Sequence, residues 1–218
     1  MADAPTTYDF GTGPVPAHRL ENGAWIADSA FVAPTAAIGS GASICSGAHL
    51  AARAIIGGGA IIGRGVVIGP SAYIGERAVV YGHAFIDEDA FISEDARIGE
   101  GTSIDGDAYI GKGASIYGHA YIGEGARIDK GASIGEGARI DKGASIGEGA
   151  RIGEGARIDK GASIGEGASI GEGARIGHGA SIGKGANISE NAYIAGGQRL
   201  ESPDDIGASS PASKGLRL

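Results

Sequence analysis

The sequence is short of the residues that fill an ordinary globular core. Among 218 residues there are four Phe, one Trp and one Met, whereas glycine supplies 43. Hydrophobic residues nevertheless make up 42% of the chain, which excludes a disordered polyampholyte, and collagen is excluded because the sequence has no Gly-X-Y period with abundant proline. The burial of apolar surface must therefore come from many copies of a small unit.

Basic charge and long apolar runs are also scarce. The net charge is −8, so the positive footprint of a protein that binds nucleic acid or anionic lipid is missing. No stretch reaches the length of a membrane span, and residues 1–23 lack the charged start and apolar run of a signal peptide. Cys45 is the one cysteine, which excludes an internal disulfide and fits a reducing compartment. We therefore expect no nucleic-acid partner, no membrane partner and a cytoplasmic location.

What the sequence does contain is a period of six. Large aliphatic residues recur at every sixth position from Ile26 to Leu200, thirty times without an insertion. Two residues before each lies a small residue, nearly always Ala, and the intervening positions hold Gly, Asp, Glu, Lys, Asn and Ser, which favour turns. The period indicates a short strand, Ala-x-Ile, in which Ala and Ile point inward and x points outward.

Three such strands and three glycine-rich corners close one triangular coil of 18 residues. We therefore predict an all-β fold, a triangular parallel β-solenoid of about ten 18-residue coils over residues 24–200, roughly 50 Å long at the usual strand spacing. Residues 1–23 are expected to form an N-terminal cap over the first coil, whose edge is otherwise open to another chain. Residues 201–218 lack the period and are expected to form a flexible C-terminal tail.

The hexapeptide 134–139, IGEGAR, matches the signature [LIV]-[GAED]-x-x-[STAV]-x, as do many of its neighbours. The chain thus resembles the hexapeptide-repeat superfamily of bacterial transferases over residues 24–200. The resemblance implies a left-handed parallel β-helix and parallel homotrimers. It indicates little about activity, because the same solenoid carries enzymes and inert scaffolds alike.

The outward positions divide the solenoid into an apolar, aromatic N-terminal half and a C-terminal half rich in Arg and Ser. One interpretation is that the aromatic side chains stack between coils and stabilise them by about 0.2–1 kcal/mol per pair. The other is an apolar contact surface, on the order of several hundred Å². We predict a self-association interface, of a homotrimer or a higher assembly, formed by Ile55, Tyr73, Phe91 and Tyr109 on one face with Val67 and Phe85 beside them.

The C-terminal half repeats itself closely. The twelve-residue word ARIDKGASIGEG occurs at 126–137, 138–149 and 156–167. Corners such as Asp141-Lys142 place opposite charges side by side, which favours a solvated surface that compensates its own charge.

Two histidines are the strongest candidates for chemistry. His83 and His119 occupy the same corner two coils apart, each in a Tyr-Gly-His-Ala word. A separation of about 10 Å excludes a metal held by both within one chain, since Zn–N bonds are about 2 Å long. A metal shared across subunits by His83 and His119 is the alternative that the resemblance to γ-class carbonic anhydrases implies. The chain lacks the Arg-Gly-Asp stretch and the His-x4-His pair of those enzymes.

The enzymes of the superfamily also differ from this chain in their loops. Hexapeptide acyltransferases extrude a loop and place a catalytic His near a subunit boundary, whereas no loop interrupts the thirty repeats. His49 and Cys45 are the residual catalytic candidates. We therefore predict a non-enzymatic structural or assembly protein, a rigid scaffold without cofactors that associates with itself through its apolar N-terminal half. The alternative is a hexapeptide-family enzyme, an acyltransferase or a γ-carbonic anhydrase-like protein, with an inter-subunit site.

Overall fold

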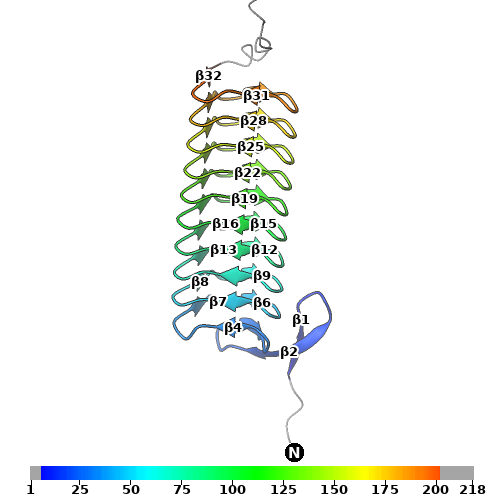
Figure 1. Ribbon diagram of the computed structural model, residues 1–218. Coiled ribbons are helices and arrows are strands. Elements are labelled where there is room, and N and C mark those ends of the chain that lie inside the picture. The colour runs from blue at the N-terminus through cyan, green and yellow to red at the C-terminus, as the bar shows by residue number, and fades with distance from the viewer. Residues whose placement is uncertain (1–5, 202–218) are drawn as a thin grey trace, which may run out of the picture.

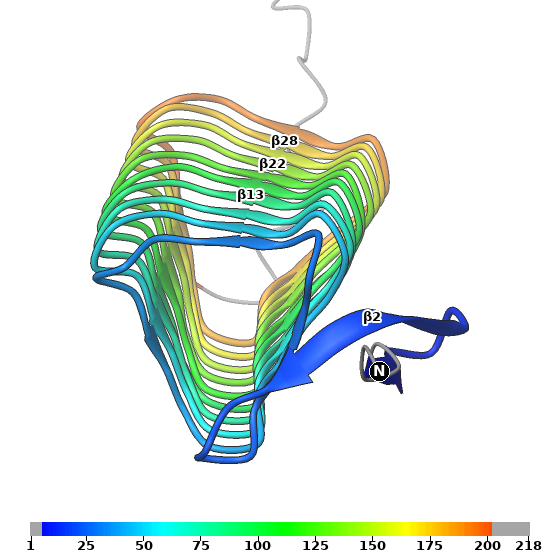
Figure 2. The ribbon, with the colours of Figure 1, turned by 90° about the horizontal axis from the view of Figure 1, so that it is seen from below.

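The computed structural model describes residues 6–201, which form a solenoid of short strands with a β-hairpin beside its first coils (Figure 1). Seen along its axis, the solenoid is a triangular prism made of three sheets (Figure 2). The triangular β-solenoid of about ten coils that the sequence predicts is confirmed. The predicted flexible tail, residues 201–218, lies outside the described residues apart from Glu201. Residues 6–201 include no helix of the length and apolarity that a membrane crossing needs.

The first sheet has twelve strands. In the order in which they pair, they are β1 (Thr7–Asp9), β2 (Pro14–Arg19), β3 (Trp25–Ala27), β6 (Ser43–Ile44), β9 (Ile61–Ile62), β12 (Val79–Val80), β15 (Arg97–Ile98), β18 (Ser115–Ile116), β21 (Ser133–Ile134), β24 (Arg151–Ile152), β27 (Ser169–Ile170) and β30 (Asn187–Ile188). The strands from β3 onward are parallel, whereas β1 and β2 form an antiparallel hairpin that continues the sheet below β3.

The second and third sheets have ten parallel strands each. The second contains β4 (Phe31–Val32), β7 (His49–Leu50), β10 (Val67–Ile68), β13 (Phe85–Ile86), β16 (Ser103–Ile104), β19 (Tyr121–Ile122), β22 (Arg139–Ile140), β25 (Arg157–Ile158), β28 (Arg175–Ile176) and β31 (Tyr193–Ile194). The third contains β5 (Ala37–Ile38), β8 (Ile55–Ile56), β11 (Tyr73–Ile74), β14 (Phe91–Ile92), β17 (Tyr109–Ile110), β20 (Arg127–Ile128), β23 (Ser145–Ile146), β26 (Ser163–Ile164), β29 (Ser181–Ile182) and β32 (Arg199–Leu200).

The core is a single column of aliphatic side chains. Ile110 and Ile128 pair one above the other in adjacent coils, and both are fully buried together with the alanines that precede them. The backbone links successive coils, as where the Ile55 amide donates to the Ala72 carbonyl at 2.9 Å and the Gly57 amide donates to the Ile74 carbonyl at 2.7 Å. Because every coil buries its apolar side against its neighbours, stability accumulates from one coil to the next.

Three corners join the sheets. The first corner joins the first sheet to the second, the second corner joins the second sheet to the third, and the third corner leads back to the first sheet. Packing at the corners is close: a Cβ on Gly75 would lie 2.4 Å from the Glu94 amide nitrogen of the next coil.

From Gly41 to Gly197 the third residue of each corner has positive φ, the left-handed region that favours glycine. In most corners of the C-terminal half this residue is glycine. The exceptions lie mainly in the N-terminal half, where a side chain in this conformation costs about 1–2 kcal/mol. They are Arg53, Ser71, Arg77, His83, Asp89, Asp95, Asp107, His119 and Asn191.

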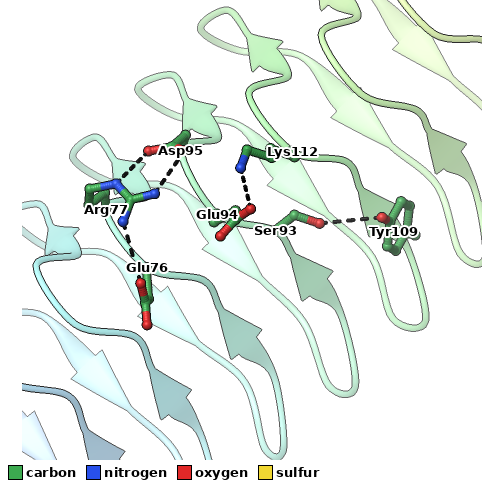
Figure 3. Close-up of polar contacts among 7 residues, drawn as sticks. All are labelled: Glu76, Arg77, Ser93, Glu94, Asp95, Tyr109 and Lys112. Carbon is green, nitrogen blue, oxygen red and sulfur yellow. Dashed lines mark hydrogen bonds and ion pairs between the residues drawn. The ribbon is translucent and has the colours of Figure 1, made fainter.

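Ion pairs reinforce the third corner (Figure 3). The Arg77 guanidinium donates to both carboxylate oxygens of Asp95 in the next coil, at 2.8 and 3.0 Å, and to Glu76 at 3.4 Å. The Lys112 ammonium donates to the Glu94 carboxylate at 2.5 Å. Each inter-coil pair joins residues 18 apart, so the ion pairs tie one coil to the next along the edge of the prism.

Candidate functional site

A groove of about 800 Å³ lies between the N-terminal hairpin and the first sheet. The hairpin contributes Phe10, Thr12 and Val15, and the outward side of the sheet contributes Ile61 and Val79. The first corner closes one side with Cys45, Ser46, Arg64, Tyr81, His83 and Glu100. This volume is that of a site for a small molecule. We call this site the hairpin groove.

The hairpin is held in place by aromatic packing. The Tyr8 ring stacks on Trp25 with the centroids 4.5 Å apart, and Phe10 packs edge-on against Tyr8 at 4.8 Å. The Asp9 carboxylate accepts hydrogen bonds from the amides of Gly11 and Gly13, at 2.7 and 3.0 Å, which shapes the turn between the two strands. The hairpin wall of the groove therefore depends on contacts with the first coil as well as on strand pairing.

The groove is apolar along the sheet and polar at the corner. The outward side chain of Ile61 is 43% exposed although it lies in the groove, so its apolar surface is open to a ligand. Cys45 is buried, and burial raises the pKa of its thiol, which makes it a poor nucleophile at neutral pH. Arg64 and Glu100 bring opposite charges to the polar side.

His83 lies at this polar side with a constrained geometry. Its φ is 58°, and its amide donates to the Arg64 carbonyl at 2.8 Å. The imidazole lies over Gly65, where a Cβ would stand 2.8 Å from Nδ1 and 3.0 Å from Cε1. Nε2 is therefore the nitrogen on the side of the ring away from Gly65. The glycine below provides the space that holds the ring.

His119 repeats this geometry outside the groove. Its φ is also 58°, its amide donates to the Glu100 carbonyl at 2.8 Å, and its imidazole lies over Gly101. Neither His119 nor Tyr117 lines the groove, whereas their counterparts His83 and Tyr81 do. The two Tyr-Gly-His-Ala segments thus share one backbone geometry, but only the first of them lines the hairpin groove.

The structure places both predicted metal-ligand candidates in the first corner, two coils apart. Residues 6–201 contain no cluster of three or more His, Cys, Asp or Glu side chains arranged to hold a metal ion. A metal shared between subunits by His83 and His119 stays a prediction.

The predicted interface residues lie on two faces. Ile55, Tyr73, Phe91 and Tyr109 pair in register in the third sheet, whereas Val67 and Phe85 pair in the second. The second corner separates the two sets, so the structure does not bring all six into one flat patch.

The outward aromatic residues of the third sheet, Tyr73, Phe91 and Tyr109, form a stacked ladder. The Tyr73 and Phe91 rings stack at 4.6 Å and the Phe91 and Tyr109 rings at 5.6 Å, and the Arg127 guanidinium lies 4.6 Å from the Tyr109 centroid. The Ser93 hydroxyl donates to the Tyr109 hydroxyl at 3.4 Å (Figure 3). Because the ring faces cover one another, the ladder joins successive coils, while Phe91 keeps 41% of its surface exposed.

The remaining catalytic candidates are separated. His49 lies on the second face, stacked on Phe31 at 4.6 Å, whereas Cys45 lines the groove. Sequence reasoning missed Phe10, Val15, Arg64 and Glu100 as groove residues. The one local signal in the hairpin is Asp9 followed by Gly11 and Gly13, which indicates a tight turn but not where the turn packs.

Comparison with known proteins matches the repeat and the fold. The model of the bacterial transferase hexapeptide (six repeats) family matches residues 119–154, 149–184 and 161–196. The structure of UDP-N-acetylglucosamine acyltransferase from Francisella novicida is similar at a TM-score of 0.62 and 22% identity, over 78% of this chain and 66% of that one. No curated protein sequence matches.

A second solved structure is that of UDP-N-acetylglucosamine O-acyltransferase from Moraxella catarrhalis, with a TM-score of 0.46 and 19% identity over 80% of this chain and 66% of that one. This chain thus spans slightly less than two thirds of the length of either acyltransferase chain. At these identities the likeness shows the fold alone.

Proposed function

We propose that this chain, a left-handed β-helix of bacterial transferase hexapeptide repeats, binds an acyl thioester in the hairpin groove. It then transfers the acyl group with His83 as general base. The observation that carries the proposal is a groove of about 800 Å³ with an apolar wall that leads to an imidazole. The solved Francisella novicida structure of similar fold is that of an acyltransferase, which supports the same class of reaction.

The lining of the groove suits an amphipathic ligand. An acyl chain would lie against Ile61, Val79 and the hairpin residue Val15, where it removes apolar surface from water. The Arg64 guanidinium would bind an anionic group of the donor, such as a phosphate. The reacting carbonyl would then lie near His83, at the boundary between the apolar and polar walls.

The reaction follows from a base at that boundary. The hydroxyl or amine of an acceptor attacks the thioester carbonyl carbon, a C–O or C–N bond forms and the C–S bond breaks. His83 takes the acceptor proton at Nε2 and returns it to the departing thiolate, so no further reactant is needed. Gly65 holds the ring from the other side and limits its rotation.

The twin histidine supplies a matched control for the test. Binding of short-chain and long-chain acyl-coenzyme A is measured by calorimetry, and thiol release is followed with UDP-N-acetylglucosamine as the acceptor. The variant His83→Ala should lose about 10²–10⁴-fold in rate, whereas His119→Ala, at an equivalent corner outside the groove, should retain the wild-type rate. Absence of binding by the wild-type protein, or equal losses in both variants, contradicts the proposal.

Self-association as a scaffold is the second candidate function, and the exposed part of the aromatic ladder at Phe91 favours it. It predicts an assembly in solution without turnover of a thioester. The mass of the wild-type protein and of the Phe91→Ser variant, measured by light scattering, tests this surface. A monomeric wild-type protein rules it out.

A further inference from the structure

The first corner of the solenoid separates two opposite charges by a glycine. Its middle position is Arg64 in one coil, Gly82 in the next coil and Glu100 in the coil after that. All three residues line the hairpin groove, and the side chains of Arg64 and Glu100 are exposed. Within residues 6–201 neither of these two side chains forms an ion pair. The corner wall of the groove therefore carries a positive and a negative group that do not neutralise each other.

The missing side chain at Gly82 explains why these charges stay apart. Opposite charges at the middle position of successive coils pair directly, as Lys142 does with Glu124 at 2.7 Å. Arg64 and Glu100 are separated by two coils, which is about 10 Å along the axis. The coil between them contributes only the glycine, which fills none of this interval with a side chain. We call the interval the Gly82 gap.

The neighbours of Gly82 line the same wall. His83 follows it in the chain and Tyr81 precedes it, and both line the hairpin groove. Tyr81 is 50% exposed, and an exposed aromatic ring attracts cations. No ion pair joins the imidazole of His83 to the Glu100 carboxylate in the described part of the chain. The carboxylate is therefore available to a cationic ligand beside the proposed base.

We propose that Glu100 binds the ammonium group of the acyl acceptor and is the residue that makes the groove select primary amines over hydroxyls. This inference rests on the proposed acyl transfer in the hairpin groove and names the acceptor class for it. Arg64 holds the anionic group of the donor at one end of the Gly82 gap, and Glu100 holds the acceptor at the other end. Donor and acceptor thus bind on two sides of His83 through opposite charges.

Charge is the basis of the selection. An ammonium group donates charge-assisted hydrogen bonds to a carboxylate, and these are about twice as strong as hydrogen bonds between neutral groups. A hydroxyl acceptor of the same shape leaves the negative charge of Glu100 without a counter-charge. The difference corresponds to about 10–100-fold in affinity.

The proton balance of amine transfer is simple. The bound ammonium group loses one proton to solvent, and the neutral amine still donates a hydrogen bond to Glu100. The nitrogen then attacks the thioester carbonyl carbon, so that a C–N bond forms and the C–S bond breaks. His83 takes the second N–H proton and delivers it to the departing thiolate. The products are an amide and a thiol.

The twin segment lacks this combination of charges. A Cβ on Gly82 would lie 3.1 Å from the Arg64 carbonyl oxygen, and a Cβ on Gly118 would lie 3.1 Å from the Glu100 carbonyl oxygen. The two glycines thus have the same backbone surroundings. Gly118, however, lies between Glu100 below and Glu136 above. Of the two gaps, the one at Gly82 lies between opposite charges and faces the groove.

Matched acceptors test the selection. Thiol release from acyl-coenzyme A is followed with 2-phenylethylamine and with 2-phenylethanol, after subtraction of the uncatalysed rate, and the wild type should have the higher kcat/KM with the amine. Glu100→Gln should lower the ratio of the two kcat/KM values about 10–100-fold. Glu136→Gln removes the same charge two coils above, outside the groove, and should keep the wild-type ratio. A wild-type preference for the alcohol, or equal changes in both variants, overturns the inference.

Amine binding without a thioester tests Glu100 directly. Calorimetry with 2-phenylethylamine alone should show binding to the wild type and loss of binding in Glu100→Gln. Gly82→Lys places an ammonium group one coil below Glu100, where it can pair as Lys130 does with Glu148, and should also abolish amine binding. Gly106→Lys makes the same change at the middle position of the second corner and should bind the amine as the wild type does.

The two measurements separate this inference from acyl transfer itself. Thioester turnover with the alcohol but no amine binding supports acyl transfer in the groove and overturns the role of Glu100. Amine binding that Glu100→Gln abolishes, without any thioester binding, supports the amine site and contradicts acyl transfer. Amine binding that persists in Glu100→Gln overturns the inference whatever the thioester result.

Discussion

The imidazole of His83 occupies the space that a side chain on Gly65 would take, with Nδ1 only 2.8 Å from the position of a Cβ. His83 and the glycine beneath its ring, Gly65, belong to adjacent coils. Because the first corner repeats this arrangement with His119 over Gly101, the protein contains its own reference for every experiment on the groove.

A side chain at Gly65 should displace the His83 ring. In Gly65→Ala the new methyl group contacts the His83 ring and pushes it from its position, so ligand binding and turnover in the groove should fall. Gly101→Ala displaces His119 in the same way and should leave the groove unchanged. Both variants carry the same strain at positive φ, about 1–2 kcal/mol, so their melting temperatures should fall together. Equal loss of binding in both would show that strain alone is responsible.

Relief of that strain is measurable at the control site. His119→Gly removes a side chain from the left-handed region, where φ is 58°. The free energy of unfolding should rise by a few tenths of a kcal/mol to about 1 kcal/mol, since the greater freedom of glycine in the unfolded chain offsets part of the gain. Gly137→Ala, at the corresponding position of the next coil, should lower it. Chemical denaturation measures both changes, and a destabilised His119→Gly would indicate a contact that the strain argument omits.

Acid should weaken the third corner. The hydrogen bond from Arg77 holds the pKa of Asp95 below its usual value, so the pair stabilises the fold above the unfolded-state pKa of about 4. This contribution is lost as the pH falls through the lowered pKa of the folded state. Asp95→Asn should therefore melt below the wild type at neutral pH and match it in strong acid. A difference in melting temperature that does not change with pH would argue against the ion pair as its cause.

Shortening a core side chain in the middle of the aliphatic column should lower the free energy of unfolding most. Ile128 is fully buried, and Ile128→Ala should lower the free energy of unfolding by about 2–5 kcal/mol. Ile128→Val should lower it by about 0.5–1.5 kcal/mol. Leu200 in the last described coil is only partly buried, so Leu200→Ala should have a smaller effect. Denaturant titration of the three variants checks this order.

The period of six is sufficient to predict the fold because it determines which side chains face inward. Ile110 and Ile128 are buried, and Tyr73 and Phe91 stack on one face, as counting by six and eighteen indicates. The same counting assigns Val67 and Phe85 to a different sheet, which separates the predicted interface into two parts. Positions inside the array follow from the sequence since every coil has the same environment.

The groove could not be predicted in this way. Its outer wall comes from Phe10 and Val15, which precede the array and have no period. Their position depends on the stacking of Tyr8 on Trp25 and on the pairing of β2 with β3, and both are contacts between non-repeating residues. His83 is recognisable as a corner residue from its word, but only the packing of the hairpin separates it from His119.

Each side of the triangular coil spans six residues, and this regular spacing has a genetic consequence. The duplicated word ARIDKGASIGEG is twelve residues long, which is two sides of the triangle rather than a full turn. Gain or loss of one copy preserves the inward position of every isoleucine, so the protein still folds. Every residue beyond that point is nevertheless rotated by two thirds of a turn. Replication slippage in this stretch can thus redirect the whole upper half of the surface in a single step, without passing through a misfolded intermediate sequence.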